Sequence, residues 1–162
     1  PHVFNVLFLC TGNSARSIMA EALLNHLGSG RFRAFSAGSN PAGQVDPLAI
    51  EQLQSARLPI AGLRSKSWEE FATPDSPHLD FVVTICDKAR GDDCPVWHGR
   101  PMTAHWGIED PLAVAESEEA KRTAFAQALE LQDKRLSTFI NLPLGALDSL
   151  TLKQALDDIG RQ

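Results

Sequence analysis

The sequence lacks several features that would point to particular classes of protein. Lysine and arginine number 15 against 20 aspartates and glutamates, and the net charge of −5 argues against general binding to nucleic acids or anionic membranes. No apolar run approaches the roughly 20 residues of a membrane span. Repeats and low-complexity tracts are absent. The first residues carry no basic region, so we expect no secretory signal and a soluble, cytoplasmic protein.

Cysteine is scarce, with only Cys10, Cys86 and Cys94. In a reducing compartment such thiols are better explained by chemistry than by crosslinking. A zinc knuckle needs two close pairs of ligands, and a site made of Cys86, Cys94 and His98 has no evident fourth ligand. We therefore expect no metal ion and no bound cofactor.

The 162 residues suit a single domain spanning 1–162, and 43% of them are hydrophobic. The pattern predicts strands over 3–9, 32–37, 80–86 and 102–106, and helices over 17–27, from Asp46-Pro47, after Ser67, over 117–140 and from Ser149 or Thr151. Alternating strands and helices indicate an α/β fold with a parallel sheet covered on both faces. Ligands of such sheets bind at the carboxyl ends of strands, where Cys10, Cys86 and Asp110 fall.

The stretch from Cys10 to Ser17 lies between the first strand and the first helix. Backbone N–H groups at a helix start, together with the helix dipole, favour an anion. Gly12 and Asn13 tolerate the left-handed backbone that such a loop needs, and Arg16 can hold two anion oxygens. The predicted oxyanion-binding residues are Thr11, Gly12, Asn13, Ser14, Ala15, Arg16 and Ser17.

Cys10 would lie at the bottom of this loop. The positive field should favour its thiolate, which is the nucleophilic form, and Ser17 could donate a hydrogen bond to the sulfur. A buried structural cysteine beside a surface arginine is the plain alternative. The order of strand, cysteine, glycine, asparagine, arginine and helix favours anion binding.

Asp110-Pro111 is the second candidate feature. An aspartate before a proline is common in turns, and alone it would carry no function. Beside a thiolate nucleophile, however, its carboxylic acid could protonate a leaving oxygen. His105 is interpreted as a packed strand residue without a catalytic role.

The loop from Cys10 to Ser17 resembles the oxyanion loop of low-molecular-weight protein tyrosine phosphatases and of the arsenate reductases built on the same fold. The run from His105 to Pro111 is similar to the His-Trp-Gly-x-x-Asp-Pro stretch of arsenate reductases. The phosphatases typically carry tyrosine after Asp-Pro, whereas Leu112 follows here and the chain has no tyrosine. The resemblance implies a three-layer fold with a four-stranded parallel sheet, helices on both faces, and Asp110 as general acid.

The segment from Val82 to Cys86, followed by Cys94-Pro95, resembles the second and third cysteines of arsenate reductases. The resemblance implies that Cys10 attacks arsenate and that Cys86 and Cys94 then pass the disulfide outward. It further implies an external thiol reductant, either thioredoxin or glutathione with glutaredoxin, and phosphate or sulfate as mimics of arsenate. We expect a monomer. The alternative for the last two cysteines is a pair of inert thiols.

Two other functions remain open. A phosphatase acting on phosphotyrosine or a small phosphate ester would need only Cys10, Arg16 and Asp110. A non-enzymatic module could bind oxyanions and respond to oxidation without turnover.

Asn13, Glu21 and Ser36 match residues that surround a potassium ion in some arsenate reductases. The acidic ligand expected near residue 66 is absent, and Arg64-Ser65-Lys66-Ser67 stands there instead. Either Lys66 or Arg64 could supply the positive charge, or the segment could be an ordinary solvated turn.

Overall fold

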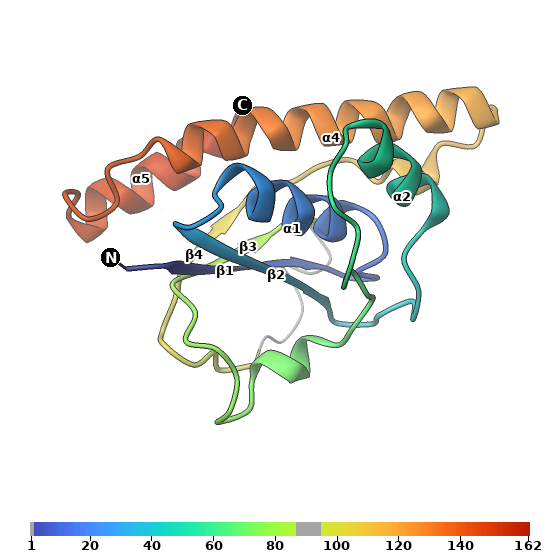
Figure 1. The fold of residues 1–162 in the computed structure, drawn as a ribbon. Coiled ribbons are helices and arrows are strands. Elements are labelled where there is room, and N and C mark those ends of the chain that lie inside the picture. The colour runs from blue at the N-terminus through green and yellow to red at the C-terminus, as the bar shows by residue number, and fades with distance from the viewer. Residues whose placement is uncertain (1, 87–94) are drawn as a thin grey trace.

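A computed structural model describes residues 2–86 and 95–162. Its sheet has four parallel strands in the order β2-β1-β3-β4 (Figure 1), which confirms the predicted α/β fold. The elements are β1 (Phe4–Cys10), α1 (Arg16–Leu27), β2 (Phe32–Gly38), α2 (Pro47–Ser55), the 3-10 helix η1 (Trp68–Phe71), β3 (Phe81–Thr84), β4 (Met102–His105), the 3-10 helix η2 (Pro111–Ala113), α4 (Glu118–Ile140) and α5 (Ser149–Ile159).

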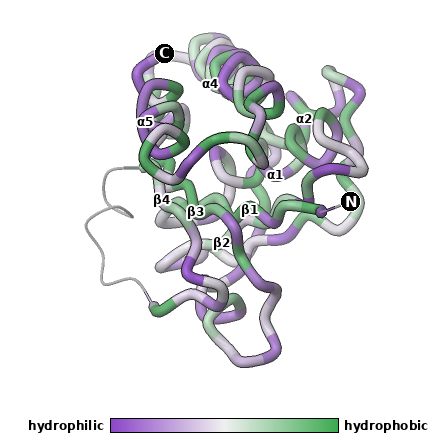
Figure 2. Tube along the Cα trace, turned by 90° about the vertical axis from the view of Figure 1, so that its left-hand side faces the viewer, coloured by the Kyte–Doolittle hydropathy of each residue, from purple (hydrophilic) through white to green (hydrophobic). Residues whose placement is uncertain are grey.

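The two faces of the sheet are covered unequally. Helices α1, α2, α4 and α5 lie on one face, where they share the larger apolar core (Figure 1). The other face is covered by η1 and its flanking loops, which pack on Leu7, Leu9 and Val82. Strands β1 and β3 lie between these layers, and most of their residues are apolar and buried (Figure 2), as is typical of parallel strands covered on both sides.

Local capping signals set most helix starts. Asp46 and Ser117 each accept a backbone N–H of the helix that follows, as the sequence predicts. Helix α5 begins at Ser149, but its capping side chain is Asp148, which accepts the N–H of Thr151 at 2.8 Å. Across residues 2–86 and 95–162, we find no helix with both the length and the apolar character that crossing a bilayer requires.

The strand register brings three chain segments to one edge of the sheet. Leu9 pairs with Thr84, and Thr84 pairs with His105, so β1, β3 and β4 end at the same level. Because the strands are parallel, the residues that follow these ends meet at the same rim. Cys10 and Cys86 therefore become neighbours although they lie far apart in the sequence.

Helix α5 covers the outer edge of β4. The ammonium of Lys153 donates to the carbonyl oxygen of Thr103 at 2.5 Å, and the indole N–H of Trp106 donates to the carbonyl oxygen of Leu156 at 2.9 Å. An exposed strand edge offers carbonyls to other chains, and a lysine on it discourages such pairing. The same contacts fix the strand that leads to Asp110.

Phe139 of α4 is fully buried against Phe32, Phe81 and Trp106, with ring centroids at 5.1, 5.4 and 5.7 Å. We expect Phe139→Ala to lower the free energy of unfolding by about 3–5 kcal/mol, because the lost ring leaves a cavity. Urea denaturation measures the change. Leu150→Ala, at a position 79% exposed, is the control and should cost less than about 0.5 kcal/mol. Equal losses in the two variants would contradict the packing described here.

Candidate active site

The oxyanion loop leaves β1 at Cys10 and enters α1 at Arg16. Asn13 has a φ of 43°, in the left-handed region that the sequence predicts for this loop. Gly12 does not adopt a positive φ, so a single residue makes the turn. Because asparagine tolerates this region better than most side chains, its place in the loop has a local explanation.

The carbonyl groups of the loop point to donors outside it. Thr11, Gly12 and Ser14 each accept a backbone hydrogen bond from the segment 40–46, at 2.9, 2.9 and 2.8 Å. In a trans peptide the next N–H points the opposite way, so the N–H groups of residues 12, 13 and 15 face the concave side. Those three N–H groups have no acceptor within the part of the chain that the structure describes. They suit a bound oxyanion.

Two sulfur atoms lie together at this loop. Cys10 and Cys86 are 4% and 7% exposed, and their thiols are hydrogen-bonded to each other. Thr11 contacts the second sulfur, with its backbone nitrogen 3.2 Å and its hydroxyl oxygen 3.3 Å from Cys86 Sγ. The structure thus brings together two cysteines that the sequence placed at one rim.

The pKa of the Cys10 thiol is raised well above its ordinary value. The main cause is the hydrogen bond with Cys86, followed by burial, while Arg16 and the N–H of Thr11 lower the pKa. The loop itself acts in the expected direction, because Arg16 and the N–H of Thr11 both favour the thiolate. The effects that oppose it come from burial and from a second sulfur beyond the end of another strand, which the sequence of the loop does not reveal.

Arg16 connects the oxyanion loop to the segment that carries Asp110. Its guanidinium donates to the carbonyl oxygen of Ile108 at 2.9 Å and lies 3.7 Å from Asp110 Oδ2. The other carboxylate oxygen of Asp110 accepts the N–H of Leu112 at 3.0 Å. A cleft of about 420 Å³ is lined by Arg16, Ile85 and the segment 107–110. The candidate acid is therefore at the mouth of the site, with its side chain 43% exposed.

Ser17 does not make the contact expected of it. Its hydroxyl is buried and accepts a hydrogen bond from the side-chain amide of Asn13 at 2.8 Å. A hydrogen bond from Ser17 to the Cys10 sulfur is absent from the described residues. Ser17 therefore supports Asn13, the residue that makes the turn.

Cys94 lies outside the described residues, so its place in a relay stays a prediction. His98, which together with Cys86 and Cys94 would lack a fourth metal ligand, has its Nδ1 3.1 Å from the carbonyl oxygen of Ser76. Within residues 2–86 and 95–162, no group of three or more histidine, cysteine, aspartate or glutamate side chains could hold a metal ion.

Two buried polar residues of α4 support the site and were missed by the sequence analysis. Gln132, 3% exposed, donates to the backbone oxygen of Arg16 at 2.9 Å. Arg135, 4% exposed, donates to the backbone oxygens of Gly107 and Gly160 at 3.1 and 3.2 Å. The sequence carries one indication of this role, because Gln132 and Arg135 are three residues apart and so lie on the same face of a long helix.

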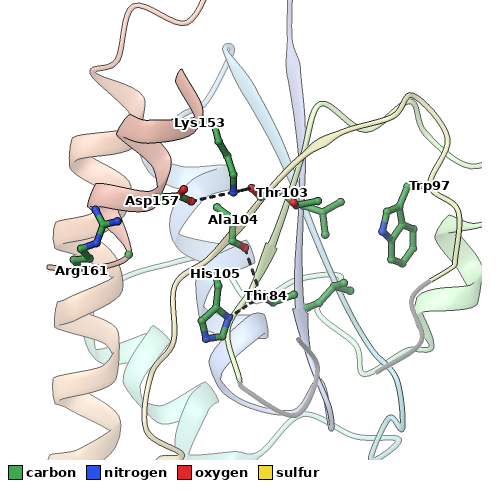
Figure 3. A pocket seen from close by; sticks show the side chains of 11 residues that line it. Thr84, Trp97, Thr103, Ala104, His105, Lys153, Asp157 and Arg161 are labelled. Carbon is green, nitrogen blue, oxygen red and sulfur yellow. Dashed lines mark hydrogen bonds and ion pairs between the residues drawn. The ribbon is translucent and has the colours of Figure 1, made fainter. Parts of the chain in front are cut away.

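A groove of about 580 Å³ lies beside the outer strand (Figure 3), and neither Cys10 nor Cys86 is among the residues that line it. The Nδ1 atom of His105 is 2.7 Å from the hydroxyl of Thr84. On the helix side, Lys153 is hydrogen-bonded to Asp157 at 2.9 Å (Figure 3). His105 is a residue of β4, as expected, but it is only half-buried and lines this groove, so its lack of a catalytic role stays a prediction.

The comparisons with known proteins agree with this geometry. Residues 5–151 match the family model described as low molecular weight phosphotyrosine protein phosphatase. The arsenate reductase of Oceanobacillus iheyensis is 34% identical over 134 residues, covering 83% of this chain and 93% of the relative. The arsenate reductase of Bacillus subtilis is 31% identical over 134 residues, with the same two coverages.

Solved structures give the same result. An arsenate reductase in a phosphate-binding state has a TM-score of 0.65 at 29% identity, over 85% of this chain and 97% of that one. A thioredoxin-dependent arsenate reductase of Corynebacterium glutamicum has a TM-score of 0.55 at 28% identity, over 83% and 62%. The chain belongs to the low molecular weight phosphotyrosine protein phosphatase family, and among its relatives are proteins named arsenate reductase.

The contact between the two sulfurs predicts how the pKa of Cys10 changes when Cys86 is removed. We expect Cys86→Ala, made in a Cys94→Ser background, to lower the pKa of Cys10, because the variant removes the hydrogen bond that raises it most. Alkylation of Cys10 by iodoacetamide near neutral pH should accelerate about tenfold or more, since the thiolate is the reacting form. Peptide mass mapping across pH measures the rate. The Cys94→Ser protein is the matched control, and an unchanged pH profile would contradict the assignment.

Proposed function

We propose that this protein is an enzyme that reduces arsenate to arsenite at the oxyanion loop. The observation that carries the proposal is the second sulfur, because Cys86 is hydrogen-bonded to Cys10 and receives the Thr11 N–H at 3.2 Å. A phosphatase of this kind needs one nucleophilic thiol. An arsenate reductase needs a second thiol, which attacks the first sulfur and releases arsenite from it. Relatives named arsenate reductase over most of the chain support the same assignment.

In the first step the N–H groups of the loop bind arsenate and Arg16 holds two of its oxygens. The thiol of Cys10 gives its proton to an oxygen of the bound arsenate dianion, and its sulfur attacks the arsenic. An As–O bond breaks, and Asp110 gives a proton to the leaving oxygen, which departs as water. The product is a covalent thiol adduct in which arsenic is still pentavalent. The guanidinium of Arg16 and the carboxyl group of Asp110 lie 3.7 Å apart, which suits this joint role.

In the second step the sulfur of Cys86 attacks the sulfur of Cys10. The S–As bond breaks and its electron pair stays on arsenic, which becomes trivalent and leaves as arsenite. The two thiols are oxidised together to a Cys10–Cys86 disulfide, so the electrons balance. The interaction between the side chains of Cys10 and Cys86 supports this step.

In the third step the thiol of Cys94 attacks Cys86, releases Cys10, and leaves a Cys86–Cys94 disulfide for an external thiol reductant. We assign thioredoxin to that role, with support from the neighbour described as a thioredoxin-dependent arsenate reductase. Glutathione with glutaredoxin is the alternative donor. We place this chemistry in the cytoplasm, in a monomer whose 162 residues act as one domain.

A phosphatase activity is the second candidate function. Cys10, Arg16 and Asp110 alone satisfy its chemistry, and the matching family model is described as a phosphatase. Arsenate and phosphate are similar tetrahedral anions, so we expect slow hydrolysis of phosphate esters beside the reduction. A passive oxyanion receptor would show neither activity.

Parallel assays of arsenite formation, with thioredoxin or glutaredoxin, and of para-nitrophenyl phosphate hydrolysis separate these functions. Cys10→Ser should abolish both activities, since it removes the nucleophile. Cys86→Ser should abolish reduction and retain hydrolysis. The control variant is Arg64→Met, an exposed position away from the sulfurs, which should keep both. Reduction that survives Cys86→Ser would exclude the internal relay.

Asp110→Asn removes the candidate acid and keeps the shape of the side chain. We expect kcat for arsenate reduction to fall about 10²–10⁴-fold with a smaller change in KM, because protonation of the leaving oxygen is lost. Hydrolysis of phenyl phosphate should fall further than that of para-nitrophenyl phosphate, whose better leaving group needs the proton less. Glu109→Gln is the neighbouring control on the same segment. Equal losses for both esters would contradict the acid role.

A further inference from the structure

A lysine lies buried directly behind the oxyanion loop. The side chain of Lys66 is 7% exposed, and its ammonium donates to the backbone oxygen of Arg64 at 2.9 Å and lies 3.7 Å from Glu21 Oε1. Arg64 points the other way, with its guanidinium 59% exposed and paired with Glu70. Of the two basic residues in this segment, Lys66 is therefore the one inside the protein.

The buried positive charge faces a buried negative one. The side chain of Glu21 is 13% exposed, and its carboxylate accepts a hydrogen bond from the hydroxyl of Ser36 at 2.6 Å. A carboxylate removed from water is costly unless a cation or strong donors compensate it. Burial lowers the pKa of Lys66 and the charge of Glu21 opposes that change. The negative charge of Glu21 therefore stabilises the charged form of Lys66.

The segment around Lys66 also holds the oxyanion loop. The backbone N–H of Lys66 donates to Asn13 Oδ1 at 2.9 Å, and the hydroxyl of Ser65 donates to the backbone oxygen of Gly12 at 3.2 Å. Asn13 is fully buried and has the positive φ of 43° on which the shape of the loop depends. A strained backbone of this kind persists when neighbouring groups hold it. The position of residues 64–66 thus bears on the position of the loop amides.

We propose that Lys66 is a positioning residue for the oxyanion site. Its ammonium ties the carbonyl oxygen of Arg64 to the carboxylate of Glu21, and its backbone then holds Asn13 in the left-handed conformation that turns the loop. The inference rests on the proposed binding of an oxyanion by that loop.

The same arrangement does not fit a potassium ion. In some arsenate reductases such an ion is surrounded by residues that match Asn13, Glu21 and Ser36. Here the ammonium already contacts the carboxylate of Glu21 and a backbone oxygen, the kinds of ligand a cation would use, and would repel a second positive charge. The chain thus carries its own cation, and the oxyanion site should work without a monovalent metal ion.

The test uses the reduced full-length protein, inorganic phosphate as the probe and titration calorimetry as the readout. We expect Lys66→Met to weaken phosphate binding about tenfold or more, because small displacements of the loop amides strongly affect binding geometry. Arg64→Met is the matched control and should stay within about twofold, since it loses only an exposed ion pair. For the unaltered protein, phosphate affinity and thermal midpoint should be equal in potassium chloride and in choline chloride at the same ionic strength.

The double variant Lys66→Met with Glu21→Gln distinguishes a loss of phosphate binding from a general loss of stability. Removing both charges leaves no uncompensated carboxylate, so the thermal midpoint should recover toward that of the unaltered protein. Phosphate binding should stay weak, because the link to the backbone of Arg64 is still missing. Recovery of both properties would mean that Lys66 only neutralises Glu21, and would overturn the proposal.

Two further outcomes are decisive. Specific stabilisation of the unaltered protein by potassium, or phosphate affinity unchanged in Lys66→Met, would overturn the inference while the proposed function stood. An unaltered protein that binds neither phosphate nor arsenate would overturn the proposed function, and this inference with it.

Discussion

The contact between Cys10 and Cys86 is the interaction on which the proposed chemistry of this protein depends. It exists because β1 and β3 are parallel neighbours that end at the same level, so that Cys10, the last residue of β1, meets Cys86, two residues after β3, at the rim. This contact raises the pKa of Cys10, the proposed first nucleophile, and it places Cys86, the proposed second nucleophile, beside it. A loop with one sulfur would be limited to transfer and hydrolysis, whereas two neighbouring sulfurs can also be oxidised to a disulfide while a bound group is reduced.

The parts of the fold that depend on local sequence were predictable. Asp46 and Ser117 cap helices where their side chains and the following residues require it, and the apolar strands β1 and β3 lie in the centre of the sheet. The order of residues from Cys10 to Arg16 likewise predicted a loop between a strand and a helix, and the structure has that loop between β1 and α1. Its binding of an anion stays a prediction. Each of these features is decided by neighbours within a few residues in the chain.

The features that could not be predicted are decided by distant groups. The raised pKa of Cys10 comes mainly from a thiol on another strand. Ser17 contacts Asn13 because the turn brings that amide to it, and the sulfur has a different partner. Gln132 and Arg135 looked like ordinary polar residues of a long helix, and only the packing of α4 on the sheet reveals what they hold. Periodicity shows which face of a helix is buried, but not which carbonyls that face will meet.

Arg135 links helix α5 to the segment that carries Asp110, the candidate proton donor. One guanidinium is hydrogen-bonded both to Gly107, three residues before Asp110, and to Gly160, just beyond the last turn of α5. Fraying of that final turn would therefore release the backbone that orients the carboxyl group, while the four strands kept all their mutual hydrogen bonds. The proposed acid catalysis by Asp110 could therefore be lost while the sheet stays folded, and the last turn of α5 is the place where the two properties separate.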